Sequence, residues 1–320
     1  MILHKPRHAS RNQWLETRLA LEVTQLFEEA PGKKRRERGL FGDILAFCFR
    51  WLNALGLTKY LKGTTLNLVR EEFEVKIPNL PNDFDGYTIL HLTDLHFDIV
   101  PEVLDAIISN LPNKPVDLAV FTGDYQEDEG AEPHETLTPL SAILRNLKTR
   151  DGALATLGNH DRAWMAEAFE GLGINVLNNE SMEIKRGTSS LTITGLDDVH
   201  FYKTEQSEKA LTESGTKCKI ALVHSSEMAE EASRNGYSLY LAGHSHGGQI
   251  RLPVIGPIIT HTMIGRQYAA GVLHHKGAVC CISRGVKASR FFFARLLCPP
   301  EAIAMTIRPN LRRHPARKSP

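Results

Sequence analysis

Short apolar runs that end abruptly in polar residues recur from residue 87 onward, and they restrict the fold more than any other feature. Continuous apolar runs are typical of strands that are covered on both faces of a sheet. The runs lie at 87–92, 117–121, 153–157, 220–223 and 237–242. Stretches with helical spacing of apolar residues separate several of them, at 101–110, 137–147 and 164–172. Strands that alternate with helices predict an α/β architecture, in which ligand sites gather at the carboxyl ends of the strands.

The residues that follow these runs are of the types that bind metal ions. They are Asp94 and His96, Asp124, the segment Asn159-His160-Asp161, His224, and finally His244 and His246. Each position taken alone has an ordinary structural explanation, because Asp can cap a helix and Asp or Asn can stabilise a turn. Five such loops at one edge of a sheet favour a shared metal site instead. Imidazole, carboxylate and amide ligands without thiolate suit manganese, iron or zinc, and they argue against copper or an iron–sulfur cluster.

Composition excludes several other classes of protein. With 320 residues, 42% of them hydrophobic and 23% charged, the chain can bury a sizeable core and is neither disordered nor collagen-like. The net charge of +1 gives no electrostatic reason to expect a nucleic-acid partner. The 5 cysteines form no Cys-x-x-Cys pair, which favours free thiols in a reducing compartment, and we therefore expect a cytoplasmic protein.

The order of the candidate residues resembles the calcineurin-like metallophosphoesterases. The matching blocks are Asp94-x-His96, Gly123-Asp124, Gly158-Asn159-His160-Asp161, His224 and Gly243-His244-x-His246. The chain is further similar to a bacterial phosphodiesterase branch through Ser283-Arg284-Gly285, Pro299-Pro300-Glu301 and the Gly-Gly pair before Gln249. That branch includes membrane-associated UDP-2,3-diacylglucosamine pyrophosphatases of lipid A synthesis. The resemblance implies a four-layer αββα sandwich of two mixed sheets.

The resemblance also implies a site for two divalent ions. The implied ligands are Asp94, His96 and His246 for the first ion, Asn159, His224 and His244 for the second, and Asp124 as the bridge between them. His160 is implied as a histidine that protonates the leaving oxygen or stabilises the transition state, and Asp161 as the residue that orients it. A water shared by two such cations ionises near neutral pH and supplies the nucleophile. We expect manganese, with iron or zinc as alternatives.

Three functions are consistent with these residues. The leading hypothesis is a hydrolase that cleaves a phosphodiester or pyrophosphate in a lipid-linked nucleotide, such as UDP-2,3-diacylglucosamine, at a membrane surface. The second hypothesis is a phosphodiesterase for a soluble nucleotide or diester. The third hypothesis is a non-catalytic scaffold on the same fold, which the presence of every expected ligand position disfavours.

Residues 33–61 combine a basic cluster with an apolar stretch. The cluster occupies 33–38, and the apolar stretch that follows contains Asp43 and Arg50, which argue against a membrane-spanning helix. An amphipathic helix beside basic residues can lie among anionic lipid headgroups. We therefore expect peripheral binding to the inner face of the cell membrane, and the alternative is that the apolar side packs on the domain.

The chain is expected to divide into three regions. Residues 1–65 form a helical and basic segment with one helix over 11–29, residues 66–308 form the metallophosphoesterase domain, and residues 309–320 form a basic tail. No candidate ligand precedes Asp94. A chain that starts near Thr65 is therefore expected to retain activity on a soluble diester.

Several other polar residues receive a structural interpretation. We interpret five further histidines as structural or surface residues, namely His91, His200, His261, His274 and His275. Arg266 and Tyr268 lie where a rim loop of the site is expected, and an arginine there suits a phosphate group through bidentate contact.

Overall fold

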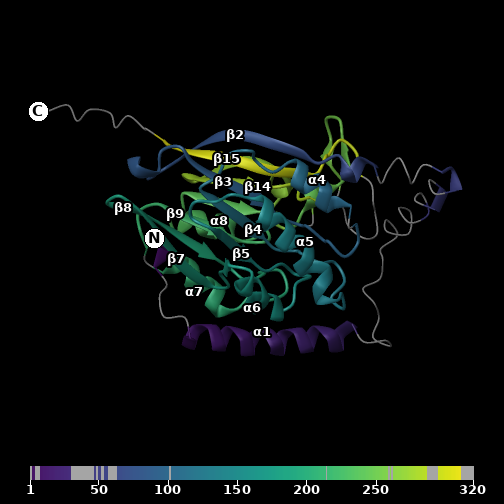
Figure 1. Ribbon diagram of the computed structural model, residues 1–320, viewed down its shortest axis with the longest axis horizontal. Coiled ribbons are helices and arrows are strands. Elements are labelled where there is room, and N and C mark those ends of the chain that lie inside the picture. The colour runs from purple at the N-terminus through teal and green to yellow at the C-terminus, as the bar shows by residue number, and fades with distance from the viewer. Residues whose placement is uncertain are drawn as a thin grey trace, which may run out of the picture.

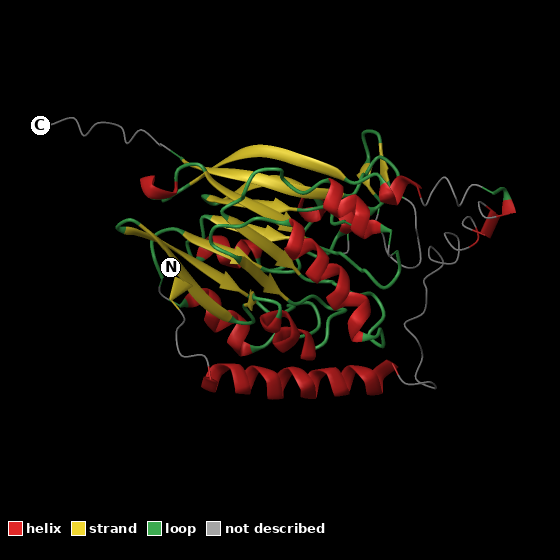
Figure 2. Ribbon diagram, viewed as in Figure 1, coloured by secondary structure: helices red, strands yellow, loops and turns green. Residues whose placement is uncertain are grey.

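The computed structural model describes residues 2–3, 8–29, 47, 50–51, 54–56, 63–100, 102–213, 215–258, 260, 262–286 and 295–310. Within these ranges two β-sheets pack face to face and helices cover their outer faces (Figure 1; Figure 2). The predicted α/β fold with two mixed sheets is confirmed. The basic cluster at 33–38, most of the stretch at 40–61, and the tail from residue 311 lie outside the described residues.

The six-stranded sheet carries the first three candidate loops. Its strands, in spatial order, are β2 (Val69–Ile77), β15 (Glu301–Pro309), β3 (Tyr87–Leu92), β4 (Leu118–Thr122), β5 (Ala153–Thr156) and β6 (Ile174–Val176). Strands β3, β4 and β5 are parallel, and Leu92, Phe121 and Ala155 are aligned across them. The loops that follow these residues therefore start at the same edge of the sheet.

The seven-stranded sheet carries the other two candidate loops. Its strands, in spatial order, are β1 (Ile2–Leu3), β7 (Glu180–Arg186), β8 (Ser189–Gly195), β9 (Lys219–Leu222), β10 (Leu239–Ala242), β14 (Ala278–Ile282) and β13 (Gly271–His275). Strands β8, β9, β10 and β14 are parallel to one another. A separate two-stranded ribbon joins β11 (Arg251–Leu252) to β12 (Gly256–Pro257).

Three clusters of buried apolar residues define the layers. The cluster between the sheets joins residues such as Ile89 and Val120 to Ile193 and Leu241. A second cluster packs the six-stranded sheet against α4 (Val103–Ser109), α5 (Pro133–Asn146) and α6 (Trp164–Gly171). The third packs the other sheet against α7 (Glu205–Thr212) and α8 (Ala229–Arg234). Short 3-10 turns are η1 (Asn82–Phe84), η2 (His246–Gly248) and η3 (Arg266–Ala269). The order of layers is the predicted αββα.

The helix α1 (His8–Glu29) lies along one side of the molecule (Figure 1). Its more polar side is turned inward. Its buried side chains are Trp14, Arg18 and Glu22, which are 3%, 1% and 7% exposed. Its apolar stripe faces outward, with Leu15, Leu19 and Val23 at 38%, 46% and 50% exposed. The predicted helix over 11–29 is present, and polar contacts rather than its leucines hold it to the domain. Among the helices that the structure describes, none is long and apolar enough to cross a membrane.

Candidate metal centre

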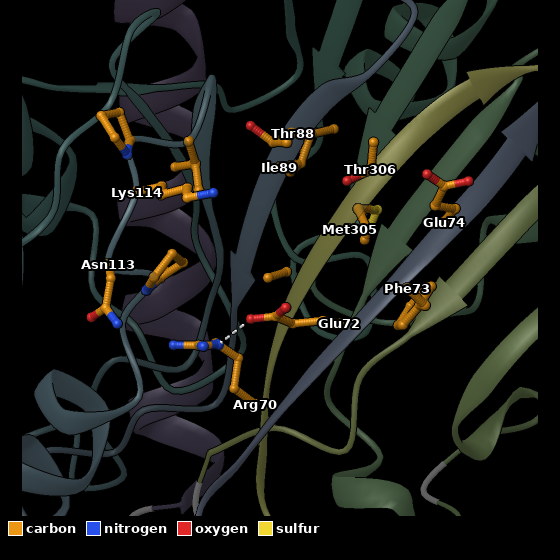
Figure 3. A pocket seen from close by; sticks show the side chains of 14 residues that line it. Arg70, Glu72, Phe73, Glu74, Thr88, Ile89, Asn113, Lys114, Met305 and Thr306 are labelled. Atoms are coloured by element: carbon orange, nitrogen blue, oxygen red, sulfur yellow. Dashed lines mark hydrogen bonds and ion pairs between the residues drawn. The ribbon is translucent and has the colours of Figure 1, made fainter.

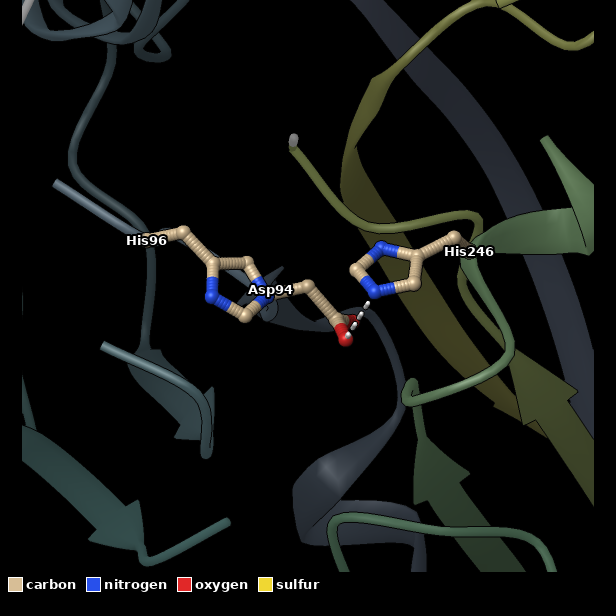
Figure 4. Close-up of side chains that lie close together, drawn as sticks. All are labelled: Asp94, His96 and His246. Carbon is tan, nitrogen blue, oxygen red and sulfur yellow. Dashed lines mark ion pairs between the residues drawn. The ribbon is translucent and has the colours of Figure 1, made fainter. Parts of the chain in front are cut away.

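Three of the predicted ligands form one potential metal site. Asp94, His96 and His246 are buried, and one ligand atom from each lies within 4.8 Å of the other two. The imidazole of His246 points at the Asp94 carboxylate, with 3.8 Å between Nε2 and Oδ1, and the ring of His96 lies on the other side of that carboxylate (Figure 4). The rings of His96 and His246 are 5.4 Å apart, centroid to centroid. This arrangement could hold one cation.

A second group of ligand atoms meets at Asp124. Asp124, His224 and His244 satisfy the same 4.8 Å criterion. His224 Nε2 lies 3.2 Å from Asp124 Oδ2, 3.1 Å from His244 Nδ1 and 3.1 Å from Asn159 Oδ1. Asp124 Oδ2 also lies 3.7 Å from His96 Nε2, which belongs to the first group. Asp124 is therefore the side chain that stands between the two groups.

The backbone of the ligand loops is strained. Positive φ angles of 55°, 42°, 56°, 68° and 49° occur at Asp94, His96, Asp124, His244 and His246, respectively. A left-handed conformation at a residue other than glycine costs on the order of 1–3 kcal/mol and persists only where the surroundings determine it. Strain of this kind is typical of ligand and active sites, and here it affects both groups.

Two glycines allow the loops to approach each other. A Cβ atom at Gly243 would collide with the Asp94 carboxylate, and one at Gly158 would collide with the Asp124 carboxylate. Neither position can therefore accept a larger residue while the carboxylates stay in place. The Gly-His and Gly-Asn pairs of the sequence thus reflect close packing between loops.

Carbonyl groups orient the ligand imidazoles. His224 Nδ1 lies 2.8 Å from the Thr122 carbonyl oxygen, and His96 Nδ1 lies 3.1 Å from that of Gln126 and 3.2 Å from Glu127 Oε2. Because a carbonyl oxygen can only accept, each Nδ1 is the donor and each Nε2 faces the centre. Such outer contacts are the usual way in which a metal-binding histidine is held in one tautomer.

The electrostatics of the centre fit divalent cations. Burial raises the pKa of Asp94 to about 6. Burial acts on Asp124 in the same direction, but the imidazoles of His224 and His160 outweigh it and hold the pKa of Asp124 well below its usual range. Burial lowers the pKa of His224, but Asp124 outweighs it and raises the value to about 10. Buried carboxylates need a compensating charge, and a cation that binds His224 must displace its proton.

His160 lies next to the two groups without belonging to either. Its backbone N–H donates to Asp124 Oδ1 at 3.1 Å, and its Nδ1 donates to the Glu127 carbonyl at 3.0 Å. Its Nε2 is therefore the nitrogen left for a ligand in the pocket. Burial lowers the pKa of His160, but the charges of Asp124, Glu127 and Asp161 outweigh burial and raise it.

Asp161 contacts the backbone of the neighbouring loops. Its carboxylate accepts hydrogen bonds from the N–H groups of Asp124 and Tyr125 at 2.8 Å each and of Gly158 at 2.6 Å. Burial and the nearby charge of Asp124 raise the pKa of Asp161 to about 7. The predicted role of orienting the ring of His160 stays a prediction. The hydrogen bonds favour an action on the loops, since the carbonyl of Glu127 contacts that ring.

The two groups open into a pocket of about 460 Å³. Besides predicted site residues, the pocket is lined by Glu127, His200, Phe201, Thr262 and Met263. His200, interpreted from the sequence as a structural or surface residue, is exposed and its ring lies 5.1 Å from that of His244. The signal in the sequence is the pair Asp197-Asp198, which follows strand β8 in the same way as the ligand loops follow their strands.

Of the other residues considered from the sequence, those that the structure describes do not line this pocket. His91 is buried with Nε2 2.8 Å from Thr122 Oγ1, and Tyr268 is buried with its hydroxyl 3.3 Å from His275 Nδ1. Arg266 donates to the carbonyl groups of residues 255 and 257, so its expected position on the rim receives no support. His261 lies outside the described residues.

A second hollow of about 550 Å³ lies elsewhere, over β2, β15 and the segment 112–116 (Figure 3). Arg70, Glu72 and Lys114 are among its polar residues, and Phe73 and Met305 among its apolar ones. It shares no lining residue with the metal pocket, and neither group of ligand atoms found among the described residues lies in it. The metal pocket is therefore the candidate site.

The fold and the paired ligand groups define a dinuclear metallohydrolase, and comparison with known proteins agrees. Residues 87–248 match the family of calcineurin-like phosphoesterases. The chain belongs to this family and is a metal-dependent phosphoester hydrolase with a site for two divalent ions.

Two bacterial relatives that the chain matches over most of their length support this assignment. The chain is 29% identical over 281 residues to the uncharacterized metallophosphoesterase YkuE of Bacillus subtilis, covering 85% of this chain and 96% of YkuE. It is 27% identical over 231 residues to the phosphodiesterase YaeI of Escherichia coli, covering 69% of this chain and 82% of YaeI. The phosphopantetheinyl hydrolase PptH of Mycobacterium tuberculosis superposes with a TM-score of 0.42 at 12% identity, covering 62% of this chain and 89% of PptH.

Proposed function

We propose that this hydrolase is a phosphodiesterase that cleaves a phosphodiester or pyrophosphate bond in a lipid-linked nucleotide at a membrane surface. The observation that carries the proposal is Asp124, which stands between two groups of metal-ligand atoms and lines the pocket. The printed name of YaeI, a phosphodiesterase, supports the choice of a diester. A scaffold role is disfavoured because members of both ligand groups line one pocket together with His160.

The proposed roles follow from the positions of the side chains. Asp94, His96 and His246 would hold one cation, Asn159, His224 and His244 the other, and Asp124 would bridge them. Bound divalent cations supply charge that stabilises phosphoryl oxygens and lowers the pKa of water.

His160 is the proposed proton donor to the leaving oxygen. Its Nδ1 is held by the carbonyl of Glu127, so Nε2 is the nitrogen that can transfer a proton. The raised pKa of this imidazole, which Asp124, Glu127 and Asp161 cause against the effect of burial, favours the protonated form that a donor needs. Bound cations would oppose this effect.

The reaction can be tested with purified protein and defined metals. We propose manganese, since imidazole, carboxylate and amide ligands suit it, and iron and zinc serve as comparisons. With Mn²⁺ we expect hydrolysis of UDP-2,3-diacylglucosamine to exceed that of a soluble diester, and a phosphomonoester to react more slowly than either. Faster hydrolysis of the soluble diester would favour a soluble nucleotide as the substrate.

The proposed membrane contact rests on an exposed apolar face in the segment before the domain. Phe47, Trp51 and Leu55 are spaced four residues apart and are 62%, 58% and 66% exposed. The rings of Phe47 and Trp51 meet edge to face at 6.2 Å, and the N–H of Leu55 donates to the carbonyl of Trp51 at 3.0 Å. Each basic residue of the preceding sequence cluster at 33–38 contributes about 1 kcal/mol near an anionic surface.

Replacing Phe47, Trp51 and Leu55 together with serine is expected to reduce sedimentation with anionic vesicles at low salt by at least about tenfold, since burial contributes about 25 cal/mol per Å². The matched control replaces the exposed α1 residues Leu15, Leu19 and Val23 with serine and should sediment like the parent. An equal loss of vesicle sedimentation in both variants would indicate that any exposed apolar side chains adsorb to the vesicles, without a specific contact at residues 47–55. If neither parent nor variant binds vesicles, the membrane proposal is wrong and the soluble diester becomes the preferred substrate.

A further inference from the structure

The side chain of Arg18 connects α1 to two loops of the metal pocket. It is 1% exposed, and its Nη2 donates to the carbonyl of Asp161 at 2.6 Å and lies 3.4 Å from that of Gly158. Its Nη1 donates to Asp197 Oδ1 at 2.5 Å, and its Cζ lies 3.3 Å from the centroid of the Tyr202 ring. One buried guanidinium therefore binds the loop 158–161 and the loop 197–202 at the same time.

In the first loop, the two carbonyl groups that Arg18 binds flank Asn159 and His160. These are the proposed amide ligand and the proposed proton donor. Glu22 pairs with Arg18 at 3.0 Å and accepts a hydrogen bond from the N–H of Ala163 at 2.7 Å. Helix α1 thus holds this loop on both sides of its two functional side chains.

In the second loop, the contact runs through consecutive aspartates. Asp197 is held by the same guanidinium and by the indole N–H of Trp14 at 2.7 Å. Its Oδ1 accepts from the N–H of Asp198 at 2.9 Å, and Asp198 Oδ2 accepts from the N–H groups of His200 and Phe201 at 3.1 Å and 2.7 Å. The pocket residues His200 and Phe201 are therefore connected to the same arginine as the loop 158–161.

Apolar packing alone does not explain this arrangement. A helix that served only to bury apolar area would turn Leu15, Leu19 and Val23 inward, and these side chains face outward. A buried ionic network is also a weak source of stability, because the cost of desolvation offsets the attraction. The arrangement instead gives each loop a fixed position.

We propose that Arg18 is a positioning residue that sets the location of Asn159 and His160 relative to the pocket residues that follow Asp198. Helix α1 is then part of the working enzyme, which reverses the expectation that a chain starting near Thr65 keeps its activity. The consequence for turnover rests on the proposed function. The consequence for metal binding does not, because it can be measured without a substrate.

The test measures Mn²⁺ binding to the full chain by titration calorimetry and turnover on a soluble diester. Arg18→Met keeps an unbranched side chain that can stay buried and removes the guanidinium with all its donors. Loss of a contact that orients a metal ligand typically costs 10–100-fold in affinity or activity. We expect one of the two Mn²⁺ ions to bind about 10–100-fold more weakly, the other to bind as in the parent, and kcat to fall more than KM changes.

Two further variants keep the test decisive. Arg18→Lys retains a charge beside Asp197 but cannot bind two carbonyl groups as well, so it should recover part of the lost affinity. Arg11→Met is the matched control, because Arg11 lies on the same helix and pairs with Glu170 at 3.0 Å and with the Val176 carbonyl at 3.3 Å, away from the metal loops. It should lower the melting temperature and leave both Mn²⁺ affinities unchanged.

Parental affinity for both ions in Arg18→Met would overturn the proposal, and so would an equal loss in Arg11→Met. If Arg18→Met does not melt cooperatively, Trp14→Phe replaces it, since this change removes the indole donor to Asp197 and keeps an aromatic ring at the position. In that variant we expect lower kcat at unchanged Mn²⁺ stoichiometry, and parental kcat would contradict the proposal. A protein that binds Mn²⁺ as expected but hydrolyses no diester would instead refute the proposed function alone.

Discussion

Replacing Asp124 with alanine is expected to abolish binding of both metal ions and, with them, hydrolysis. Its carboxylate is the one that lies near imidazoles of both groups, 3.2 Å from His224 Nε2 and 3.7 Å from His96 Nε2. Two dications held close together repel each other, and a shared carboxylate reduces that repulsion while it contributes a ligand to each. Metal analysis after gel filtration should therefore find two equivalents of Mn²⁺ in the parent and almost none in the variant.

Two controls separate this effect from loss of the fold. His246→Ala should lose mainly one ion, because His246 belongs to the first group alone. Asp117→Ala removes a buried carboxylate that binds Thr88 and Arg186 and is no member of either ligand group, so it should lower stability and keep both ions. Two equivalents of Mn²⁺ retained in Asp124→Ala would show that the bridging role is wrong.

The metal pocket could be anticipated because its side chains directly follow strand ends. Asp94, Asp124 and Asn159 come after three neighbouring parallel strands, and parallel strands end at one edge of a sheet. His224 and His244 follow neighbouring parallel strands of the other sheet. Local sequence and the rule for strand ends were therefore enough to select residues that the structure brings together, and their roles as ligands stay predictions.

The direction in which α1 faces could not be anticipated. Its sequence has helical periodicity, but periodicity identifies two faces without saying which one is buried. The inward face was selected by polar groups of two distant loops, since Arg18 contacts the carbonyl of Asp161 and the carboxylate of Asp197. A partner separated by more than a hundred residues leaves no local pattern. His200 is exposed, as the interpretation as a surface residue allows, but its position in the pocket beside His244 could not be anticipated, because the two histidines follow different strands.

The strands at the carboxyl end of the chain illustrate a further limit. Strand β15 pairs with β2 along its whole length and lies between β2 and β3, although β2 and β3 are consecutive in the sequence. The pairing partners of a strand depend on how it packs in the folded sheet and not on its local β-propensity. The insertion of β15 between β2 and β3 therefore leaves no local signal. The four-layer fold therefore came from family resemblance, and the order of strands within its sheets came only from the structure.

Replacing His160 with alanine is expected to leave both metal ions bound and to lower turnover by about 10²–10⁴-fold, the range for a positioned proton donor or acceptor. The ring belongs to neither ligand group, and its Nδ1 is held by the carbonyl of Glu127 at 3.0 Å. Its backbone N–H, which donates to Asp124 Oδ1 at 3.1 Å, remains in the variant. In His160→Ala kcat should therefore fall while the Mn²⁺ stoichiometry stays at the parental value. Asp124→Ala should instead lose both.

The leaving group distinguishes proton donation from other roles of His160. An alkoxide leaving group needs a proton in the transition state, whereas p-nitrophenolate leaves without one, so His160→Ala should lose much more activity on an alkyl diester than on bis-p-nitrophenyl phosphate. The matched control is His200→Ala, which removes another histidine that lines the pocket and should affect both substrates alike. An equal loss on the two substrates in His160→Ala would indicate electrostatic stabilisation of the phosphoryl group. Activity within a few-fold of the parent on both would remove His160 from the mechanism.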